Sequence, residues 1–464
     1  MLKRCHQPRQ GGFNICFVAE LDVPGEEESV WALMRIPIPG MGIFPEEKLR
    51  AEAAIMAFVR EHTTIPVPRV WHFSTAAENP TGLGPYLITD FIPDTKHLFD
   101  YLMAPKGTSK WQANIINSQM PEEELQGYYA QMADILLQLD RLPTMPLCGS
   151  LSQDWDGKFA VIGHPLPQNV VELVTGSGVP KVLIPPAGTT YKTSDDFYRY
   201  LANAHMAQLC FQHNDCVHGE DDARDKYIAR HLFRRLARQN LLVKKEEGDG
   251  TPERFKLICD DLTPYNCLTR DGKIVAMVDW EFAYFGPASI ASGPALYPRF
   301  LDIFLRGMEE LERTKYNDKK EEEEEDALAS QLERFDLDST GINEAKGALS
   351  NGTDKEPQPF LQLPLSVRMR QNWENGRFWI NWAARSSFAF DTIYWKYIDR
   401  PFFGEDNVEG GFEKRLCQLN RFGLEVMERV VNDKMKQRSN RKLKHWSSKW
   451  VQEYLEYVTG QIHL

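Results

Sequence analysis

The sequence lacks three features that would each define a class of protein. Its eight cysteines show no C-x-x-C spacing, which argues against a zinc ribbon or a disulfide framework and favours a reducing compartment. It has no uninterrupted apolar stretch near the roughly 20 residues that span a bilayer. It has no basic excess, because 54 Lys and Arg stand against 66 Asp and Glu, for a net charge of -12. We therefore expect a soluble protein with no membrane span and no nucleic-acid partner.

Size and termini bound the next expectations. At 464 residues, 42% of them hydrophobic, the chain can form one large two-lobed domain or two ordinary domains. The N-terminus has no apolar signal-peptide core, which favours an intracellular, most simply cytoplasmic, location. Lys3, Arg4 and Arg9, with no acid among the first ten residues, leave a mitochondrial location as the alternative.

The first part of the chain has the pattern of a small antiparallel sheet with one helix. Residues 11–37 predict three strands, in "GGFNICFVAEL" and, after a turn at Pro24-Gly25, "SVWALMRIPIP". Residues 45–62 predict a helix, with Pro and acids in its first turn. Two more strands are expected in "IPVPRVWHFS" and "GPYLITDFIPD". The order predicts an N-terminal lobe over residues 1–94.

The remainder, residues 95–464, is predicted to be a larger, mainly helical lobe, which makes the fold class α+β. An amphipathic helix is expected at 121–142, and later helices at 378–398 and 412–436. Two β segments, "FKLICDDL" and "KIVAMVDWEF", are separated by a turn at residues 270–272. Solvated insertions are expected near 243–254 and 313–356, the second containing an acidic run.

One spacing of acids and an amide points to phosphoryl transfer. Asp261 stands five residues before Asn266, and Asp279 follows on the next β segment. Phosphoryl transfer needs a carboxylate at the attacking hydroxyl and oxygen ligands for Mg²⁺. We expect Asp261 to orient the hydroxyl and accept its proton, and Asn266 and Asp279 to bind the metal. Asp260 competes for the first role, but the five-residue spacing selects its neighbour.

The segment "DDLTPYNCLTRDGKIVAMVDWEFAYFGP" resembles the catalytic and metal-binding core of the aminoglycoside phosphotransferase and choline-kinase-like family, especially its fungal branch. In the N-terminal lobe, "GGFNICF", "ALMRIP", "AEAAIMAFVREHTTIPVPRV" and "GPYLITDFIPD" follow the family's order. The resemblance covers nearly the whole chain outside the insertions. It implies a bilobal, protein-kinase-like fold.

The resemblance also implies a nucleotide site in the N-terminal lobe. Gly11 and Gly12 correspond to the strand-turn-strand that covers the phosphates. Arg35 stands where kinase-like proteins carry the phosphate-binding lysine, and it is expected to pair with Glu52 on the following helix. An edge-strand surface charge is the alternative interpretation of Arg35. A guanidinium has a different geometry from an ammonium, so this departure puts the transfer rate in doubt more than nucleotide binding.

The strand "YLITDFI" resembles the hinge that receives adenine. Backbone groups of Asp90 and Ile92 are expected to bond the base edge, with Thr89 behind it. A second departure is Cys259, which stands where the family has a histidine that anchors the catalytic loop. A thiol can replace the packing of that histidine but not its hydrogen bonds.

The function implied is Mg-ATP-dependent phosphorylation of a hydroxyl on a small molecule, with GTP as an alternative nucleotide. A protein kinase is disfavoured, because Thr263 replaces the lysine and Asp279-Trp280-Glu281 replaces Asp-Phe-Gly. The alternative class is a catalytically weak or inactive module that binds nucleotide or a partner. The acceptor is not specified by the sequence. Glu281 can line a cationic-substrate pocket, and four tryptophans can either stack on an acceptor or pack between helices: Trp373, Trp379, Trp382 and Trp395.

Overall fold

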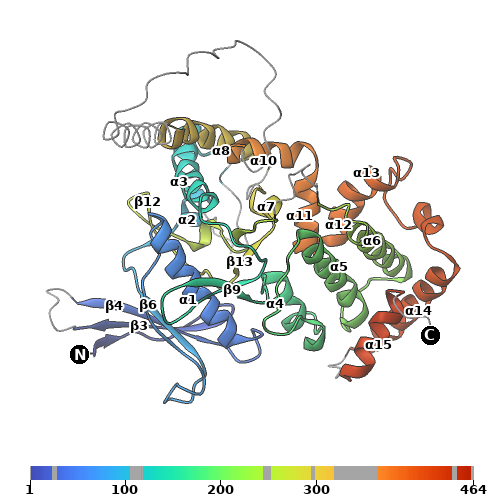
Figure 1. Ribbon diagram of the computed structural model, residues 1–464, viewed down its shortest axis with the longest axis horizontal. Coiled ribbons are helices and arrows are strands. Elements are labelled where there is room, and N and C mark those ends of the chain that lie inside the picture. The colour runs from blue at the N-terminus through green and yellow to red at the C-terminus, as the bar shows by residue number, and fades with distance from the viewer. Residues whose placement is uncertain are drawn as a thin grey trace, which may run out of the picture.

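An antiparallel sheet forms the N-terminal lobe of the computed structural model (Figure 1). The structure describes residues 2–22, 29–104, 117, 119–243, 252–293, 298–317, 363–441 and 447–460. The strand order is β1-β3-β4-β6-β5, with β2 beside β3. The strands are β1 (Leu2–Cys5), β2 (Arg9–Gln10), β3 (Asn14–Leu21), β4 (Val30–Pro37), β5 (Val70–Ser74) and β6 (Tyr86–Asp90).

The prediction of three strands between residues 11 and 37 is wrong in its division of the segment. The described part of that segment forms two strands, because β3 pairs with β4 without a break from Asn14 to Leu21. The additional strands lie before Gly11, and the glycine pair forms the turn between β2 and β3. The predicted turn at Pro24-Gly25 lies outside the described residues.

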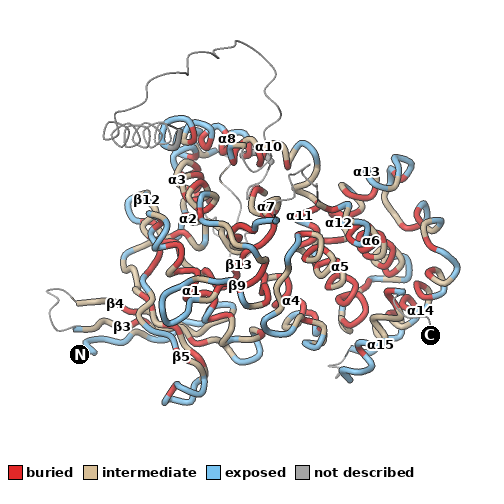
Figure 2. Tube along the Cα trace, in the orientation of Figure 1, coloured by how far each residue is buried: buried red, intermediate tan, exposed pale blue. Residues whose placement is uncertain are grey.

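Helix α1 (Pro45–His62) has the predicted bounds. Pro45 stands in its first turn, where a missing N–H costs no helical bond, and acids follow where the helix dipole favours them. The helix contacts β5 of the sheet and strands of the C-terminal lobe, so it is buried on more than one side, as Figure 2 shows. Ile55, Phe58 and Val59 are almost inaccessible to solvent. This burial fixes Lys48 and Glu52 at the seam between the lobes.

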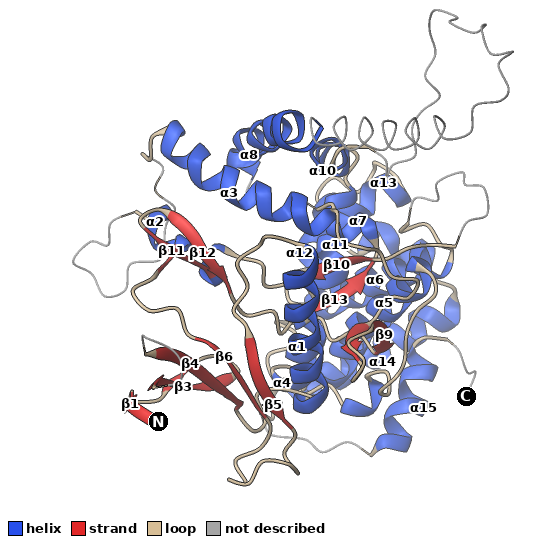
Figure 3. Ribbon diagram, turned by 60° about the vertical axis from the view of Figure 1, so that its left-hand side comes forward, coloured by secondary structure: helices blue, strands red, loops and turns tan. Residues whose placement is uncertain are grey.

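The C-terminal lobe is mainly helical, as expected, and Figure 3 shows its helices grouped apart from the N-terminal sheet. Helix α3 packs on α8, and α6 packs on both α5 and α14. The helices are α2 (Leu98–Leu102), α3 (Glu122–Asp140), α4 (Gln168–Thr175), α5 (Ser194–Phe211), α6 (Glu220–Arg238), α7 (Ala288–Ala291), α8 (Pro298–Leu311), α10 (Leu365–Glu374), α11 (Arg377–Arg385), α12 (Phe390–Ile393), α13 (Asp399–Phe403), α14 (Arg421–Arg438) and α15 (Ser448–Val458).

Small sheets position the loops of this lobe. Strand β7 pairs with β11, β11 with β12, β8 with β9, and β10 with β13. Their bounds are β7 (Lys96–His97), β8 (Ser150–Gln153), β9 (Phe159–Gly163), β10 (Lys256–Cys259), β11 (Cys267–Arg270), β12 (Lys273–Met277) and β13 (Ala283–Gly286). The two predicted β segments therefore do not pair with each other. The turn at residues 270–272 joins β11 to β12, and β11 and β13 were not predicted.

Two later predictions are also corrected. The single helix expected at 378–398 is broken, because α11 ends at Arg385 and α12 begins at Phe390. The helix expected at 412–436 is a 3₁₀ helix, Glu413–Gln418, followed by α14. Most of the predicted insertions, residues 244–251 and 318–362, lie outside the described residues. We keep residue 94 as the proposed boundary between the lobes, because the strands change sheet between β6 and β7.

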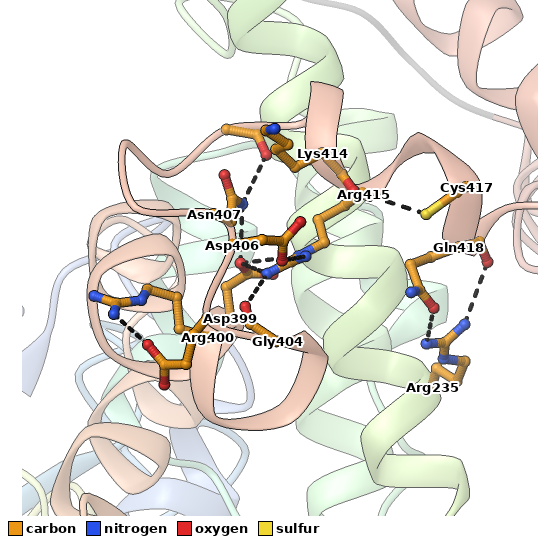
Figure 4. Close-up of polar contacts among 12 residues, drawn as sticks. Arg235, Asp399, Arg400, Gly404, Asp406, Asn407, Lys414, Arg415, Cys417 and Gln418 are labelled. Atoms are coloured by element: carbon orange, nitrogen blue, oxygen red, sulfur yellow. Dashed lines mark hydrogen bonds and ion pairs between the residues drawn. The ribbon is translucent and has the colours of Figure 1, made fainter.

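A buried ion pair fixes the segment between α13 and α14. The guanidinium of Arg415 donates to Asp399 at 2.8–3.0 Å, to Asp406 at 2.8 Å and to the carbonyl oxygen of Gly404 at 2.6 Å (Figure 4). Asp399 and Arg415 are almost completely buried. The pair replaces an apolar core in this compact loop. Within the described ranges, no helix combines the length and the hydrophobicity needed to cross a membrane.

Candidate active site

A cavity of about 240 Å³ opens between the two lobes. Nine of the ten residues predicted for the site line it: Gly11, Gly12, Arg35, Glu52, Thr89, Asp90, Ile92, Asn266 and Asp279. Apolar side chains, among them Leu33, Leu268 and Val278, line it as well. The tenth predicted residue, Asp261, adjoins the cavity through its hydrogen bond with Asn266. Residues from distant parts of the sequence thus meet at one place.

The catalytic loop folds back on itself between β10 and β11. Cys259 ends β10, and a 3₁₀ turn over Pro264–Asn266 leads into β11. This turn lets the Asn266 amide Nδ2 donate to the backbone oxygen and to Oδ2 of Asp261, both at 2.9 Å. Burial raises the pKa of Asp261, while the hydrogen bond from Asn266 opposes that change. A carboxylate held in this way can accept a proton more readily than an exposed one.

The neighbouring acid, Asp260, makes structural contacts. Its Oδ1 accepts from Nη1 of Arg385 at 2.9 Å, and its Oδ2 accepts from the backbone N–H of Gln168 at 3.2 Å. Burial raises the pKa of Asp260, and Arg385 opposes the change. Because both of its oxygens are engaged, Asp260 connects the catalytic loop to the N-terminus of α4 and to the end of α11.

Asp279 follows β12 in a conformation that few non-glycine residues adopt. Its φ is 64°, in the left-handed region, where strain of this kind is typical of functional sites. The preceding N–H, of Val278, donates to the carbonyl oxygen of Asn266 at 2.9 Å, which brings the two predicted metal ligands together. Burial and then the charge of Glu281 raise the pKa of Asp279 to about 7. Its side chain is still 32% exposed, so a ligand can reach it.

The donor set at this point fits Mg²⁺. A carboxylate from Asp279 and the side-chain oxygen of Asn266 are hard oxygen ligands, which Mg²⁺ takes from a protein while phosphates and water complete its shell. The raised pKa of Asp279 also indicates acids that lack sufficient positive charge nearby. Over the described part of the chain, no group of three or more His, Cys, Asp or Glu is placed to hold a metal alone. A metal here therefore depends on phosphate oxygens as further ligands.

Arg35 joins the two lobes. From β4, its Nη2 pairs with Glu52 on α1, and its Nη1 donates to Oδ1 of Asp279 at 3.1 Å. Burial alone would lower the pKa of Arg35, but the carboxylates of Glu52 and Asp279 outweigh burial and raise it. The edge-strand alternative for this residue is wrong, because the side chain is only 12% exposed and lines the cavity.

A second buried cation, Lys48, was not predicted. Its Nζ lies 2.5 Å from Oε2 of Glu281 and 3.9 Å from the ring centre of Phe282. The amide of Asn14 donates to the same Glu281 oxygen at 3.4 Å. Glu281 is therefore part of an ion pair and does not line a pocket as a free acid. The only sequence signal was the four-residue spacing of Lys48 and Glu52, which puts both on one face of α1.

The predicted hinge has one N–H already in use. The N–H of Asp90 donates to the carbonyl oxygen of Arg69 at 3.0 Å, and its carboxylate accepts from Nε1 of Trp71 at 2.5 Å. The carbonyl oxygen of Asp90 and the N–H of Ile92 are then the groups left for a base edge. Thr89 is buried behind them. The prediction is thereby narrowed to one acceptor and one donor.

Cys259 is half-buried at the end of β10. Burial raises the pKa of its thiol well above the usual range, and the charges of Asp260 and Asp261 add to that change. A thiolate nucleophile at this position is therefore disfavoured.

A second cavity, of about 320 Å³, lies on the C-terminal-lobe side of the catalytic loop. Asp260 and Arg385 line it together with Trp382 and Phe388. Of the four tryptophans considered from the sequence, Trp382 is the one that faces this cavity. The others, Trp373, Trp379 and Trp395, pack against the core.

The fold and the cavity define a two-lobed, protein-kinase-like protein. The chain belongs to the phosphotransferase enzyme family APH, whose model matches residues 25–295. This match does not separate the fungal branch from others, so that assignment stays a prediction. A comparison with curated proteins finds no match.

Several solved structures are similar to the chain. An apo thermostable mutant of aminoglycoside phosphotransferase APH(4)-Ia is 15% identical, with a TM-score of 0.38, and the match covers 87% of this chain and 96% of that one. The GDP complex of an aminoglycoside 2'-phosphotransferase-IIIa mutant is 12% identical, with a TM-score of 0.40 and coverage of 94% and 93%. Macrolide 2'-phosphotransferase MphH from Brachybacterium faecium is 13% identical, with a TM-score of 0.32 and coverage of 66% and 75%.

Proposed function

We propose that the protein transfers the terminal phosphoryl group of Mg-ATP, or alternatively of Mg-GTP, to a hydroxyl of a small molecule. One observation carries this proposal: Asp261, Asn266 and Asp279 gather at the lobe seam, beside the Arg35–Glu52 pair. Phosphoryl transfer depends almost entirely on such positioning and charge. Family membership supports the reaction class.

Each cavity residue has a role in this proposal. The base lies among Leu33, Leu268 and Val278, with its edge at the Asp90 carbonyl and the Ile92 N–H. The phosphates lie under the turn at Gly11 and Gly12 and toward the guanidinium of Arg35. Mg²⁺, when bound by Asn266 and Asp279, supplies positive charge for the phosphate oxygens.

Asp261 acts on the acceptor. It orients the acceptor hydroxyl and accepts its proton as the hydroxyl oxygen forms a bond to the terminal phosphorus. The bond from that phosphorus to the bridging oxygen breaks, and the nucleoside diphosphate leaves with the electron pair. The raised pKa of Asp261 suits it to accept a proton.

Turnover of nucleotide against a panel of hydroxylated amines tests this proposal. We expect Asp261→Asn to lower turnover by about 100-fold or more while nucleotide affinity changes little, because the residue acts on the acceptor. Asp260→Asn is the matched variant, and its effect should be on stability. Equal turnover by Asp261→Asn and the unmodified protein contradicts the assigned role.

A nucleotide-binding module without catalysis is the second candidate. Two observations favour it: Arg35 engages Asp279 directly, and Cys259 cannot supply the hydrogen bonds of a loop-anchoring histidine. Mg²⁺-dependent nucleotide binding without turnover of any acceptor would support this candidate. No nucleotide binding at all would contradict both.

A further inference from the structure

The second cavity adjoins the catalytic loop but has none of its lining residues in common with the nucleotide cavity. Its walls come from α4, from the end of α11 and from the residues before α12. Asp260, one residue before Asp261, lines it and connects these walls to the catalytic loop. The charge of Glu172, another lining residue, contributes to the raised pKa of Asp261. The cavity is therefore in position to hold the molecule that receives the phosphoryl group.

The walls of this cavity are held rigidly. Asn169 and Ser387 bond each other twice, at 3.0 Å from Nδ2 to Oγ and at 2.9 Å from the Ser387 N–H to Oδ1. The Ser387 hydroxyl also contacts Nδ1 of His205 at 2.8 Å. All three residues are buried. This network sets the distance between α4 and the α11–α12 connection, so the shape of the cavity is preformed.

The charge of the lining is one negative unit that is not neutralised. Asp260 is paired with Arg385, so these two cancel. Glu172 accepts only from the neutral amide of Gln168, at 2.9 Å, and has no cationic partner within the described residues. One carboxylate can pair with one ammonium group. A polycation such as an aminoglycoside would leave its other ammonium groups without partners here.

The remaining lining is aromatic. Trp382 is 39% exposed and Phe388 is 58% exposed, although both are large apolar side chains. Aromatic faces of this kind bind rings, and they attract cations that lie above them. The volume of about 320 Å³ is at the lower end of the range for ligand pockets. The site thus fits a molecule of one or two rings.

We infer that the acceptor is a small hydroxylated monoamine with an apolar or aromatic ring, whose ammonium group pairs with Glu172 and whose ring lies against Trp382 and Phe388. The inference rests on the proposed function, because Asp261 must take the proton of the acceptor hydroxyl. Glu172 and Trp382 are then the residues that determine specificity.

Four probes separate the contributions of amine, ring and charge. Phenylethanolamine has all three groups, styrene glycol lacks the amine, ethanolamine lacks the ring, and gentamicin carries several amines. Calorimetry on the full chain, saturated with Mg²⁺ and a non-hydrolysable ATP analogue, measures their binding. We expect phenylethanolamine to bind about tenfold or more tightly than each of the other three. Equal binding of styrene glycol, or tightest binding of gentamicin, overturns the inference.

Two variants assign the effects to residues. Glu172→Gln should weaken phenylethanolamine about tenfold and leave styrene glycol unchanged. Trp382→Ala should weaken phenylethanolamine but not ethanolamine. Glu123→Gln, on the exposed start of α3, and Trp155→Ala, 94% exposed on the β8–β9 turn, are matched controls without effect. Unchanged probe affinities in Glu172→Gln overturn the inference.

Nucleotide binding is measured in the same samples before each probe is added. Normal Mg-nucleotide binding with no preference for a monoamine overturns the acceptor class but leaves the proposed function intact. Absent nucleotide binding overturns the proposed function, and the inference with it.

Discussion

At Arg35 one guanidinium holds carboxylates from two lobes, Glu52 on α1 and Asp279 after β12. The planar fork of arginine can bond two partners at once, whereas an ammonium group is a single point of charge. Arg35 therefore both supplies positive charge for phosphates and closes the seam before they arrive.

Replacing Arg35 with methionine should lower nucleotide affinity about tenfold or more, because the phosphates lose their main cation. Arg35→Lys should stay within about threefold, since it keeps the charge and can still reach one acid. Arg306→Met, at an exposed pair with Glu122, is the control without effect. Calorimetric titration with Mg-ATP measures all three. Unchanged affinity in Arg35→Met would show that this residue does not contact phosphate.

The pKa of Asp279, about 7, predicts a pH dependence for Mg²⁺ binding. An acid with a raised pKa keeps its proton to higher pH, and a metal must displace that proton. Affinity for Mg²⁺ in the nucleotide complex should fall about tenfold from pH 8 to about pH 6, and binding should release a proton below pH 7. Free nucleotide titrated at the same pH values corrects for phosphate protonation. A flat profile after that correction would contradict the raised pKa.

The same pKa has a consequence for stability. The fold favours the protonated form of Asp279, so the stability that this group contributes is present below its ordinary pKa of 3.8 and is lost as pH rises through about 7. We expect Asp279→Asn to be at least as stable as the unmodified protein at pH 8 without metal. Thermal unfolding with and without Mg-nucleotide checks this, since the variant should lose the stabilisation by Mg-nucleotide.

Spacing along the chain was sufficient to find some of these residues and not others. The five positions from Asp261 to Asn266 favoured Asp261 over Asp260, and Asp260 proves to be engaged by Arg385 and Gln168. Lys48 could not be found in this way, because its partner Glu281 lies far along the sequence and only the packing of α1 against the C-terminal lobe brings them together.

At the scale of elements, local signals decided what was predictable. Proline and acids at the start of α1 mark its N-terminus, so its bounds followed from the sequence. The pairing of β10 with β13 has no local signal, because β11 and β12 come between them. The break after α11 is set by tertiary contacts: Ser387 leaves the helix to bond Asn169 and His205.

The buried pair of Arg415 and Asp399 gives a prediction for the segment between α13 and α14. Arg415→Met should lower the free energy of unfolding by about 3–5 kcal/mol, because it leaves the Asp399 carboxylate buried without a partner. Adding Asp399→Leu should recover much of that loss. Arg421→Met, in an exposed pair with Glu425, should cost under about 1 kcal/mol. Denaturant unfolding measures these values, and equal losses for Arg415 and Arg421 would contradict the difference in burial.

At the scale of the molecule, the two lobes have one continuous apolar core and a polar seam. The core cluster includes side chains of α1 and of the helical lobe. Three polar contacts cross the seam at the cavity: Arg35 with Asp279, Lys48 with Glu281, and Asn14 with Glu281. Binding of nucleotide at this seam is therefore expected to raise the thermal stability of the whole protein.

The measurement that tests the central claim most directly is calorimetric binding of ATP with and without Mg²⁺ to three forms of the protein. The account predicts that the unmodified protein and Asp261→Asn bind Mg-ATP within about threefold of each other, and that Asp279→Asn binds it about tenfold or more weakly. Binding of Mg-ATP by Asp279→Asn with the affinity of the unmodified protein would contradict the account.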